Sequence, residues 1–218
     1  MSHDEQIDSD YYDENSDRAE PARGRTRWSR FLITSVATLA VAGTLVGLTA
    51  NGVLAAEFSI SGLPFTVTAD QIDGSGFEQF ATLDNMPDNS PNAGNTGGQI
   101  VVVVSAINSA TLNNLCQSIS LGGTFLKITA GNNGTPVSAT TLVVDSDQIS
   151  GDASFNNISI GQDASTLSEV PGVTGNLGVF GQQADHVTIK NLRQDNFATT
   201  AAAFTLPNLS ITFSDTGC

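Results

Sequence analysis

QIVVVVSAI, residues 99–107, is the stretch that decides the fold class of this chain. Its centre, Ile100 to Val104, is continuously apolar, which predicts a strand buried on both faces. Similar short runs rich in Val, Ile, Thr, Phe and Ser continue to the C-terminus, each bounded by Gly, Asn, Asp or Pro. The predicted strands are 57–61, 64–69, 99–107, 124–130, 138–145, 153–160, 184–192, 198–206 and 209–214. The sequence therefore predicts an all-β domain, with one short helical turn over 113–119.

The architecture expected for these strands is an antiparallel β roll or sandwich. The phrases ADQIDG (69–74) and SDQISG (146–151) resemble each other, and LNNL (112–115) resembles FNNI (155–158). Recurring phrases of this kind also occur in a parallel β-solenoid, which is the alternative architecture. Their spacing is irregular here, and this irregularity favours the antiparallel roll or sandwich.

Two longer segments contain no predicted strand. Residues 84–98 (DNMPDNSPNAGNTGG) hold Met86 as their one large apolar side chain, which predicts a mobile excursion. Residues 168–183 are Gly-rich but contain several apolar side chains. This second segment indicates irregular structure that caps the core, with a lid or rim as the alternative.

The N-terminal quarter of the chain has the order of an export signal. Residues 1–20 are acidic and poor in apolar side chains, which predicts a disordered tail. Four arginines between positions 23 and 30 then precede an uncharged run at 31–56. Positive charge stays on the cytoplasmic side, so the following part is predicted to be translocated. The expected divisions are a cytoplasmic segment 1–30, a hydrophobic helix 31–56 and an exported domain 57–218.

The hydrophobic run, FLITSVATLAVAGTLVGLTANGVLAA, supports two outcomes. A bilayer is spanned by about 20 residues, so residues 31–54 are long enough to act as a membrane anchor with the N-terminus inside. The run ends in small residues that suit cleavage after Ala55 or Ala56, and cleavage is the favoured outcome. Either outcome predicts a secreted or cell-surface domain.

The charge of the exported part excludes one class of partner. It contains 14 acidic residues and three basic ones (Lys127, Lys190 and Arg193), a net charge of about −11. Nucleic-acid phosphates are bound by clustered Lys and Arg. A nucleic-acid partner is therefore not expected.

Cys116 and Cys218 are the two cysteines of the chain. Outside the cytoplasm an even number of cysteines favours a disulfide. The bond would attach the last residue to the middle of the domain. Two cysteines and one exported histidine are too few for a zinc site, so no metal and no cofactor is expected there.

Several phrases of the exported part resemble a family of secreted actinobacterial proteins, and Cys218 agrees with that family. Most members are described as uncharacterised, but several carry the label cholesterol esterase. The resemblance covers nearly all of the chain after Ala56 and implies a hydrolase that acts on lipid or sterol esters. The matching phrases are LNNLCQSIS (112–120), KITAG (127–131), DASFNNISIGQDASTL (152–167), GVFGQQADHVTIKNL (178–192) and FTLPNLSITF (204–213).

The residues themselves support a hydrolase weakly. The usual nucleophile elbow, G-x-S-x-G, has no match in the exported part. His186 is the one histidine after residue 56, so it would be the base of any Ser-His-Asp mechanism. Asp185 would point to the opposite face of the strand. The remaining candidate carboxylates are Asp70, Asp147 and Asp195, and the candidate nucleophiles are Ser75, Ser105 and Ser118. The favoured interpretation is that His186 lies on a half-exposed strand and has no catalytic role.

Two acidic groupings offer further alternatives. Asp145 and Asp147 would share one face of a strand, with Asp152 beyond a turn, and such carboxylates are calcium ligands. The spacing is not that of an EF-hand loop, so a solvated acidic strand is favoured. Asp70 and Asp73 could form an acid–base pair, but the adjacent Gly74 favours a turn.

Aromatic volume points to a third possibility, a lipophilic ligand held by a curled sheet. Most of the phenylalanines are expected to belong to the core: Phe65, Phe77, Phe80, Phe125, Phe155, Phe180, Phe197, Phe204 and Phe213. The sequence thus favours an exported binding or structural domain of the cell envelope with a lipophilic ligand. The alternative is an ester hydrolase that depends on His186.

Overall fold

The computed structural model describes residues 59–218. The predicted acidic tail, Arg-rich segment and hydrophobic helix, and the start of the strand predicted at 57–61, lie outside these residues. Residues 59–61 are irregular, so that predicted strand is not found in the part that the structure describes. No helix within 59–218 has the length and apolar character needed to cross a membrane.

The described residues form one antiparallel sheet, which confirms the all-β prediction. Every strand pairing in it is antiparallel, unlike the ladders of a parallel solenoid. The strands are β1 (Phe65–Asn85), β2 (Gln99–Asn113), β3 (Leu115–Ser120), β4 (Phe125–Ala130), β5 (Val137–Asn156), β6 (Ser159–Asp163), β7 (Phe180–Thr200), β8 (Ala203–Thr205) and β9 (Ser210–Ser214). A single turn of 3-10 helix, η1 (Ala164–Thr166), follows β6.

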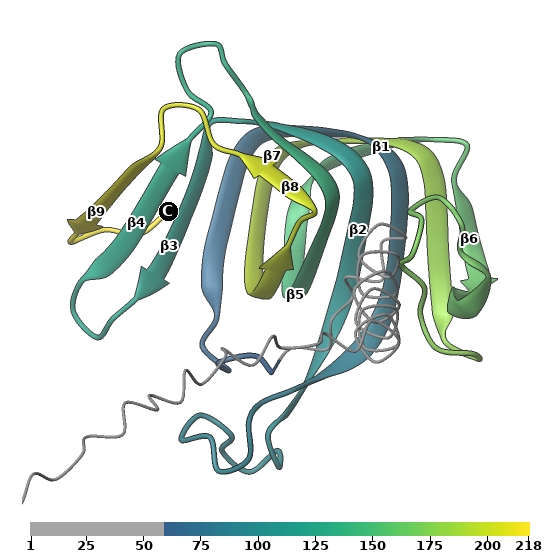
Figure 1. Cartoon of the computed structure of the whole chain (residues 1–218), viewed down its shortest axis with the longest axis horizontal. Helices are drawn as coiled ribbons and strands as arrows, with labels where there is room; N and C mark the ends of the chain where they lie inside the picture. The colour runs from purple at the N-terminus through teal and green to yellow at the C-terminus, as the bar shows by residue number, and fades with distance from the viewer. Residues whose placement is uncertain (1–58) are drawn as a thin grey trace, which may run out of the picture. The chain divides into compact units, whose positions relative to one another are not determined.

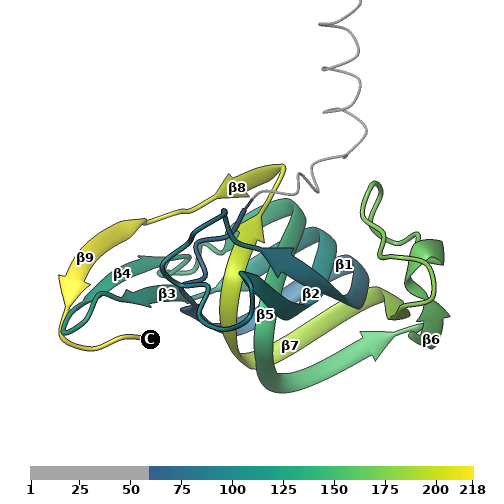
Figure 2. The same ribbon diagram turned by 90° about the horizontal axis from the view of Figure 1, so that it is seen from below.

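The four long strands, β1, β2, β5 and β7, form a closed ring. β1 pairs with β2, β2 with β5, β5 with β7, and β7 pairs again with β1. Figure 1 shows these strands arching side by side, and Figure 2 shows β1 and β2 across from β5 and β7. We call this unit the four-strand ring. The shorter strands β3, β4 and β9 continue the sheet beyond β1 as a wing on one side.

Irregular positions in the ladders bend the long strands enough for four of them to close. The β5–β7 ladder shifts register near Ser146 and again at Gly151. Thr141 in β5 and Asn191 in β7 adopt positive φ angles of 46° and 53°. Bulges of this kind increase local twist and allow a sheet to curl on itself. Gly76 in β1 is a position that requires glycine: its φ is 65°, and a Cβ there would lie 2.5 Å from the carbonyl oxygen of Glu169.

These bulges explain why the predicted strands were too short. Residues 64–69 were predicted as a whole strand, but they begin the 21-residue β1. Asp70, Gly74 and Gly76 have the composition of a turn, yet the strand continues through them. The helical turn predicted at 113–119 is wrong, because Leu115–Ser120 forms β3 and pairs with β1 and β4.

The prediction that residues 100–104 are buried on both faces is also wrong. Val102 is buried, but the neighbouring Val101 is 68 % exposed. This end of β2 pairs with β1 alone, because its pairing with β5 begins at Val103. Val101 therefore lies beyond the part of β2 that pairs on both edges, and its side chain is open to solvent.

The core has two principal parts. The larger lines the inside of the four-strand ring and includes Ile72, Phe77 and Val187. The smaller lies on the outer face, where Val170 and Val173 pack against Phe80. The Gly-rich segment 168–183 thus contributes core residues. In the segment 84–98, Met86 is buried against Ile60 and Ala198.

The disulfide between Cys116 and Cys218 is present, as predicted. The two Cα atoms are 5.9 Å apart, and the bond links β3 to the end of the chain. The backbone N–H of Cys218 also donates to the Ser118 hydroxyl at 2.9 Å. The C-terminal residue is therefore held against the wing by a covalent bond and a hydrogen bond.

Candidate functional site

A cavity of about 270 Å³ lies inside the four-strand ring. A void of this size is unusual, because most gaps in protein interiors are smaller than a water molecule, which takes up roughly 30 Å³. Inward-facing residues of all four long strands form its wall, since alternate side chains of each strand point to the same face. The apolar part of the wall is Val67, Ile72, Phe77, Ile107, Leu112, Leu115, Leu142, Val144, Ile149, Ala153, Phe155, Ile189, Leu192 and Phe204.

The cavity opens to solvent along one stretch of β5. Ser150, Gly151 and Ala153 line the cavity and are solvent-exposed. In this stretch β5 pairs with β7 on one edge, and its pairing with β2 has ended at Ser146. We call this opening, at residues 150–153, the mouth. Phe204 also lines the cavity and is 41 % exposed, but it lies on β8, opposite Ala139 of β5.

A second hollow, of about 530 Å³, adjoins the cavity. Gln117, Thr199 and Phe204 line both spaces, so these residues mark where they meet. Phe65 and Phe197 line the second hollow from β1 and β7. Phe180 and Phe213 are 61 % and 73 % exposed and line neither space. The prediction that most of the phenylalanines belong to the core therefore holds for Phe77 and Phe80 but not for these two.

Uncharged polar side chains form part of the cavity wall. Gln79 and Ser105 lie opposite each other on β1 and β2, and the Gln79 amide donates to the Ser105 hydroxyl at 2.9 Å. The Gln182 amide in turn donates to the Gln79 carbonyl oxygen at 2.6 Å. Gln194 and Asn196 on β7 belong to the same wall and are buried.

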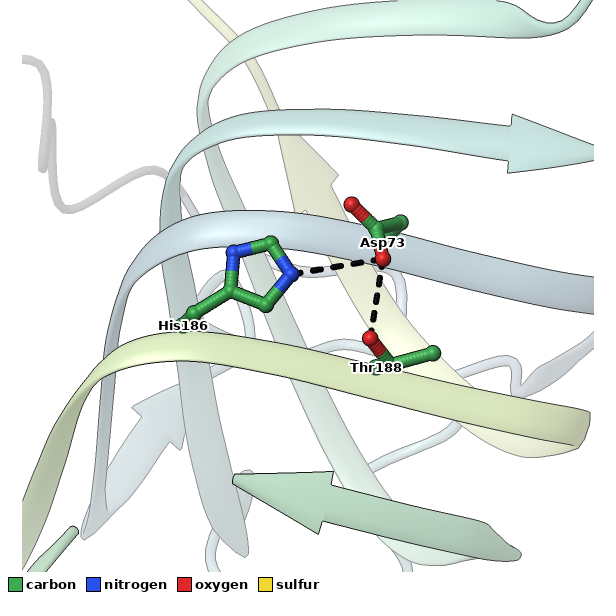
Figure 3. A network of polar contacts seen from close by, with 3 residues as sticks. All are labelled: Asp73, His186 and Thr188. Atoms are coloured by element: carbon green, nitrogen blue, oxygen red, sulfur yellow. Dashed lines mark hydrogen bonds and ion pairs between the residues drawn. The ribbon is translucent and has the colours of Figure 1, made fainter. Parts of the chain in front are cut away.

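His186 lies outside this cavity, on the outer face of the ring (Figure 3). Its Nε2 atom is 3.3 Å from Oδ2 of Asp73 on the neighbouring strand. The Thr188 hydroxyl donates to the same carboxylate oxygen at 2.8 Å. The carboxylate beside the histidine is thus Asp73, which had been considered only as a partner of Asp70. Strand register identifies it, because Asp73 pairs with Thr188, two residues from His186.

The candidate nucleophiles are not gathered around the histidine. Ser75 is the cross-strand neighbour of His186, but within 59–218 no hydrogen bond joins the two side chains. Ser105 lines the cavity, inside the ring, and accepts a hydrogen bond from Gln79. Ser118 is buried beside the disulfide, where it binds the end of the chain. The described residues therefore do not assemble a catalytic triad.

The candidate carboxylates are occupied by other contacts. Asp195 accepts from the Thr66 hydroxyl at 2.8 Å, and Asp147 is solvent-exposed. Asp70 accepts from the Asn114 amide at 2.5 Å. None of these three side chains faces His186.

One type of contact involves residues of three of the recurring phrases, ADQIDG, LNNL and FNNI. Asn114 donates to Asp70, Asn157 donates to Asp185, and Asn191 donates to Asp152. Each of these asparagines has a positive φ angle. Asparagine tolerates this conformation better than other non-glycine residues. The recurring Asp and Asn residues therefore stabilise bends of the strands.

The acidic residues considered for calcium do not form a metal site. Within residues 59–218, no three His, Cys, Asp or Glu side chains gather closely enough to hold one ion. Asp152 is bonded to Asn191. Asp145 and Asp147 were expected to share one face of a regular strand. The strand is not regular between them, because the β5–β7 ladder shifts register on both sides of Ser146.

The structure instead pairs Asp145 with Asp84, a contact that the sequence pattern did not indicate. Burial and the facing Asp84 carboxylate raise the pKa of Asp145 to about 7. Burial also raises the pKa of Asp84, and a hydrogen bond from Asp145 opposes that rise. Both carboxyls therefore hold a proton to higher pH than a free aspartate does. Asp84 stands where a loop was predicted, which is why the sequence did not reveal this pair.

Glu78 is a further buried acid on the outer face. Its side chain is fully buried, and its Oε1 atom accepts from the backbone N–H of Val170 at 2.7 Å. Burial raises the pKa of this carboxyl. The hydrogen bond joins β1 to the segment that covers this face of the ring.

Comparison with known proteins identifies a family and nothing more specific. No curated protein matches the sequence, and no solved structure matches the fold. One family model matches residues 61–218, which is almost all of the described part of the chain. The chain therefore belongs to the family of unknown function designated DUF6230.

Proposed function

We propose that this protein is an exported domain of the cell envelope that binds a lipophilic molecule inside the four-strand ring. The observation that carries the proposal is the cavity of about 270 Å³, whose wall is mostly apolar and which opens at the mouth. Burial of apolar surface in such a space is favourable. The side chains of the mouth give a ligand a route to the interior.

The location rests on the N-terminal sequence and on the disulfide. The arginines and the apolar run at 31–56 have the order of an export signal. The Cys116–Cys218 bond is of a type that persists in oxidising compartments. An envelope domain, either released or anchored through residues 31–54, is consistent with both features.

The mouth provides the first test, through Ala153→Arg in the full chain held in lipid nanodiscs. The probe is a decyl alcohol that carries a photoactivatable diazirine, and unlabelled decanol is the competitor. We expect the variant to need about tenfold more probe for the same labelling of the cavity peptides, because the arginine places a charge across an apolar entrance. Peptide mass spectrometry measures the labelling. Ala153 is solvent-exposed, so the substitution leaves the core unchanged.

Ser154→Arg is the matched control. Ser154 is exposed on the same strand but does not line the cavity, so labelling should equal that of the wild type. Equal labelling of Ala153→Arg and the wild type would refute the proposed entrance. Labelling that decanol does not compete away would refute the binding site itself.

Ester hydrolysis is the second candidate function, and the contact between Asp73 and His186 is the observation that favours it. A Ser-His-Asp site needs the histidine bonded to a nucleophile as well as to a carboxylate. His186 is near Ser75 in register, but the site lies on the outer face and His186 lines neither described hollow. This geometry supports binding better than catalysis.

We expect His186→Ala to have no effect on ester hydrolysis. The full chain and the variant would be compared on a sterol ester and on a long-chain acyl ester, with release of the fatty acid as the measurement. Both proteins should give the background rate, because no candidate nucleophile within 59–218 is hydrogen-bonded to the histidine. A wild-type rate above background that falls in His186→Ala would contradict this expectation and establish a hydrolase.

A further inference from the structure

The polar residues of the cavity wall indicate which class of lipophilic molecule the cavity binds. This inference rests on the proposed function. Gln194 is the central residue of this argument. It lies on β7 between Val67 of β1 and Ile149 of β5, and all three side chains line the cavity. The side chain is 8 % exposed, and among residues 59–218 its amide has no hydrogen-bond partner. Because Gln194 lines the cavity, its amide faces that space with its hydrogen-bonding groups free, and a ligand group that bonds to it there would gain affinity.

Asn196 is the second such residue, two positions further along β7. It is 1 % exposed and lines the same cavity. The Ser146 hydroxyl donates to its Oδ1 atom at 2.8 Å. This bond fixes the orientation of the amide and leaves its NH₂ group to donate. Gln194 and Asn196 therefore offer two donors from one strand of the wall.

The position of these amides orients a ligand. Val67, the neighbour of Gln194, also pairs with Gln117 of β3, which lines both the cavity and the adjoining hollow. Thr199, three residues beyond Asn196, lines both spaces as well. The amides thus lie toward the junction of the two spaces. The opposite part of the wall, around Ile72, Leu112 and Ile189, is apolar.

Charge and volume exclude the commonest membrane lipids. None of the residues that line the cavity is charged. An ionised carboxylate or phosphate buried there would have no cation to offset its desolvation. The volume of about 270 Å³ is close to the lower end of the roughly 300–1,000 Å³ of small-molecule sites. Such a space takes one acyl chain and not two.

We infer that the cavity binds a neutral, single-chain lipid whose hydroxyl or ester group hydrogen-bonds to Gln194 and Asn196. The chain extends into the apolar part of the ring. The amides select the head group, and the uncharged wall rejects fatty-acid anions and phospholipids. Ser146 positions Asn196 for this role.

Competition among ligands with the same chain tests the inference. The full chain in nanodiscs would be photolabelled with the diazirine-bearing decyl alcohol in the presence of decanol, methyl decanoate, decanoate or decane. Each competitor concentration is corrected for its measured partition into the lipid. Decanol and methyl decanoate should compete at about tenfold lower concentration than decane, the effect expected of one or two hydrogen bonds. Decanoate at neutral pH should compete least.

Gln194→Leu should raise the decanol concentration needed for half-competition toward that of decane, because only the Asn196 donor remains, and leave the concentration of decane unchanged. Leucine has a similar volume and removes an unpartnered amide, so the fold should be retained, which circular dichroism checks. Gln148→Leu, at an exposed position of β5, is the matched control and should behave as the wild type.

The outcomes distinguish failure of the head-group site from failure of the proposed binding function. Equal competition by decane and decanol in the wild type would refute the head-group site while leaving the apolar cavity in place. Strongest competition by decanoate would refute a neutral ligand. Absence of competition by all four compounds would overturn the proposed binding function as well.

Discussion

Replacement of both Cys116 and Cys218 by alanine is expected to lower the free energy of unfolding by about 4–5 kcal/mol. The two residues are 102 positions apart in the sequence, so the bond closes a long loop and removes much conformational freedom from the unfolded chain. In the folded state the bond attaches the chain end to β3. Urea unfolding of the full-length wild type and double variant, both without reductant, measures the difference.

Ser118→Ala is the control for this experiment. It removes the hydrogen bond from the backbone N–H of Cys218 and leaves the disulfide intact. A loss of about 1 kcal/mol is expected. If the double cysteine variant lost no more than Ser118→Ala, the disulfide would contribute little, and the wing would be held by its strand pairing alone.

Stability should fall as pH rises from about 4 to 8, and Asp145→Asn should remove most of this dependence. The pKa of Asp145 is raised from 3.8 to about 7 in the folded protein, so the unfolded chain releases this proton at lower pH. Between the two pKa values the folded state retains a proton that the unfolded state has lost, and stability decreases with rising pH. Each pKa unit corresponds to about 1.36 kcal/mol. Partial exposure of the pair reduces the total effect to about 2–4 kcal/mol.

Asparagine keeps the shape of the protonated carboxyl and can donate to Asp84 at every pH. Asp145→Asn should therefore be more stable than the wild type at pH 8 and similar to it at pH 4. Asp147→Asn, at an exposed position two residues away, is the matched control and should retain the wild-type profile. Thermal unfolding across this pH range measures all three proteins. A flat wild-type profile would contradict the raised pKa of Asp145, since the raised pKa of Glu78 acts in the same direction.

The candidate site could be predicted in part. The disulfide followed from a count of two cysteines, and the idea of a lipophilic ligand followed from the number of phenylalanines. The wall of the cavity could not be predicted from the sequence, because Val67 and Gln194 become neighbours only when β1 pairs with β7. Gln194 itself has no distinguishing local pattern. Asp73 was missed as the partner of His186 for the same reason, since the two residues lie 113 positions apart.

The amino-acid sequence by itself determined that the described domain is all-β and that Cys116 can bond to Cys218. These properties depend on local alternation of apolar residues and on composition, both of which are visible in a single chain. The tertiary structure alone decided the lengths of the strands and the closure of the ring. Asp70, Gly74 and Gly76 have the composition of a turn, and only pairing on both edges of β1 keeps them in a strand. The cavity exists because bulged strands distant in sequence enclose a space that their side chains do not fill.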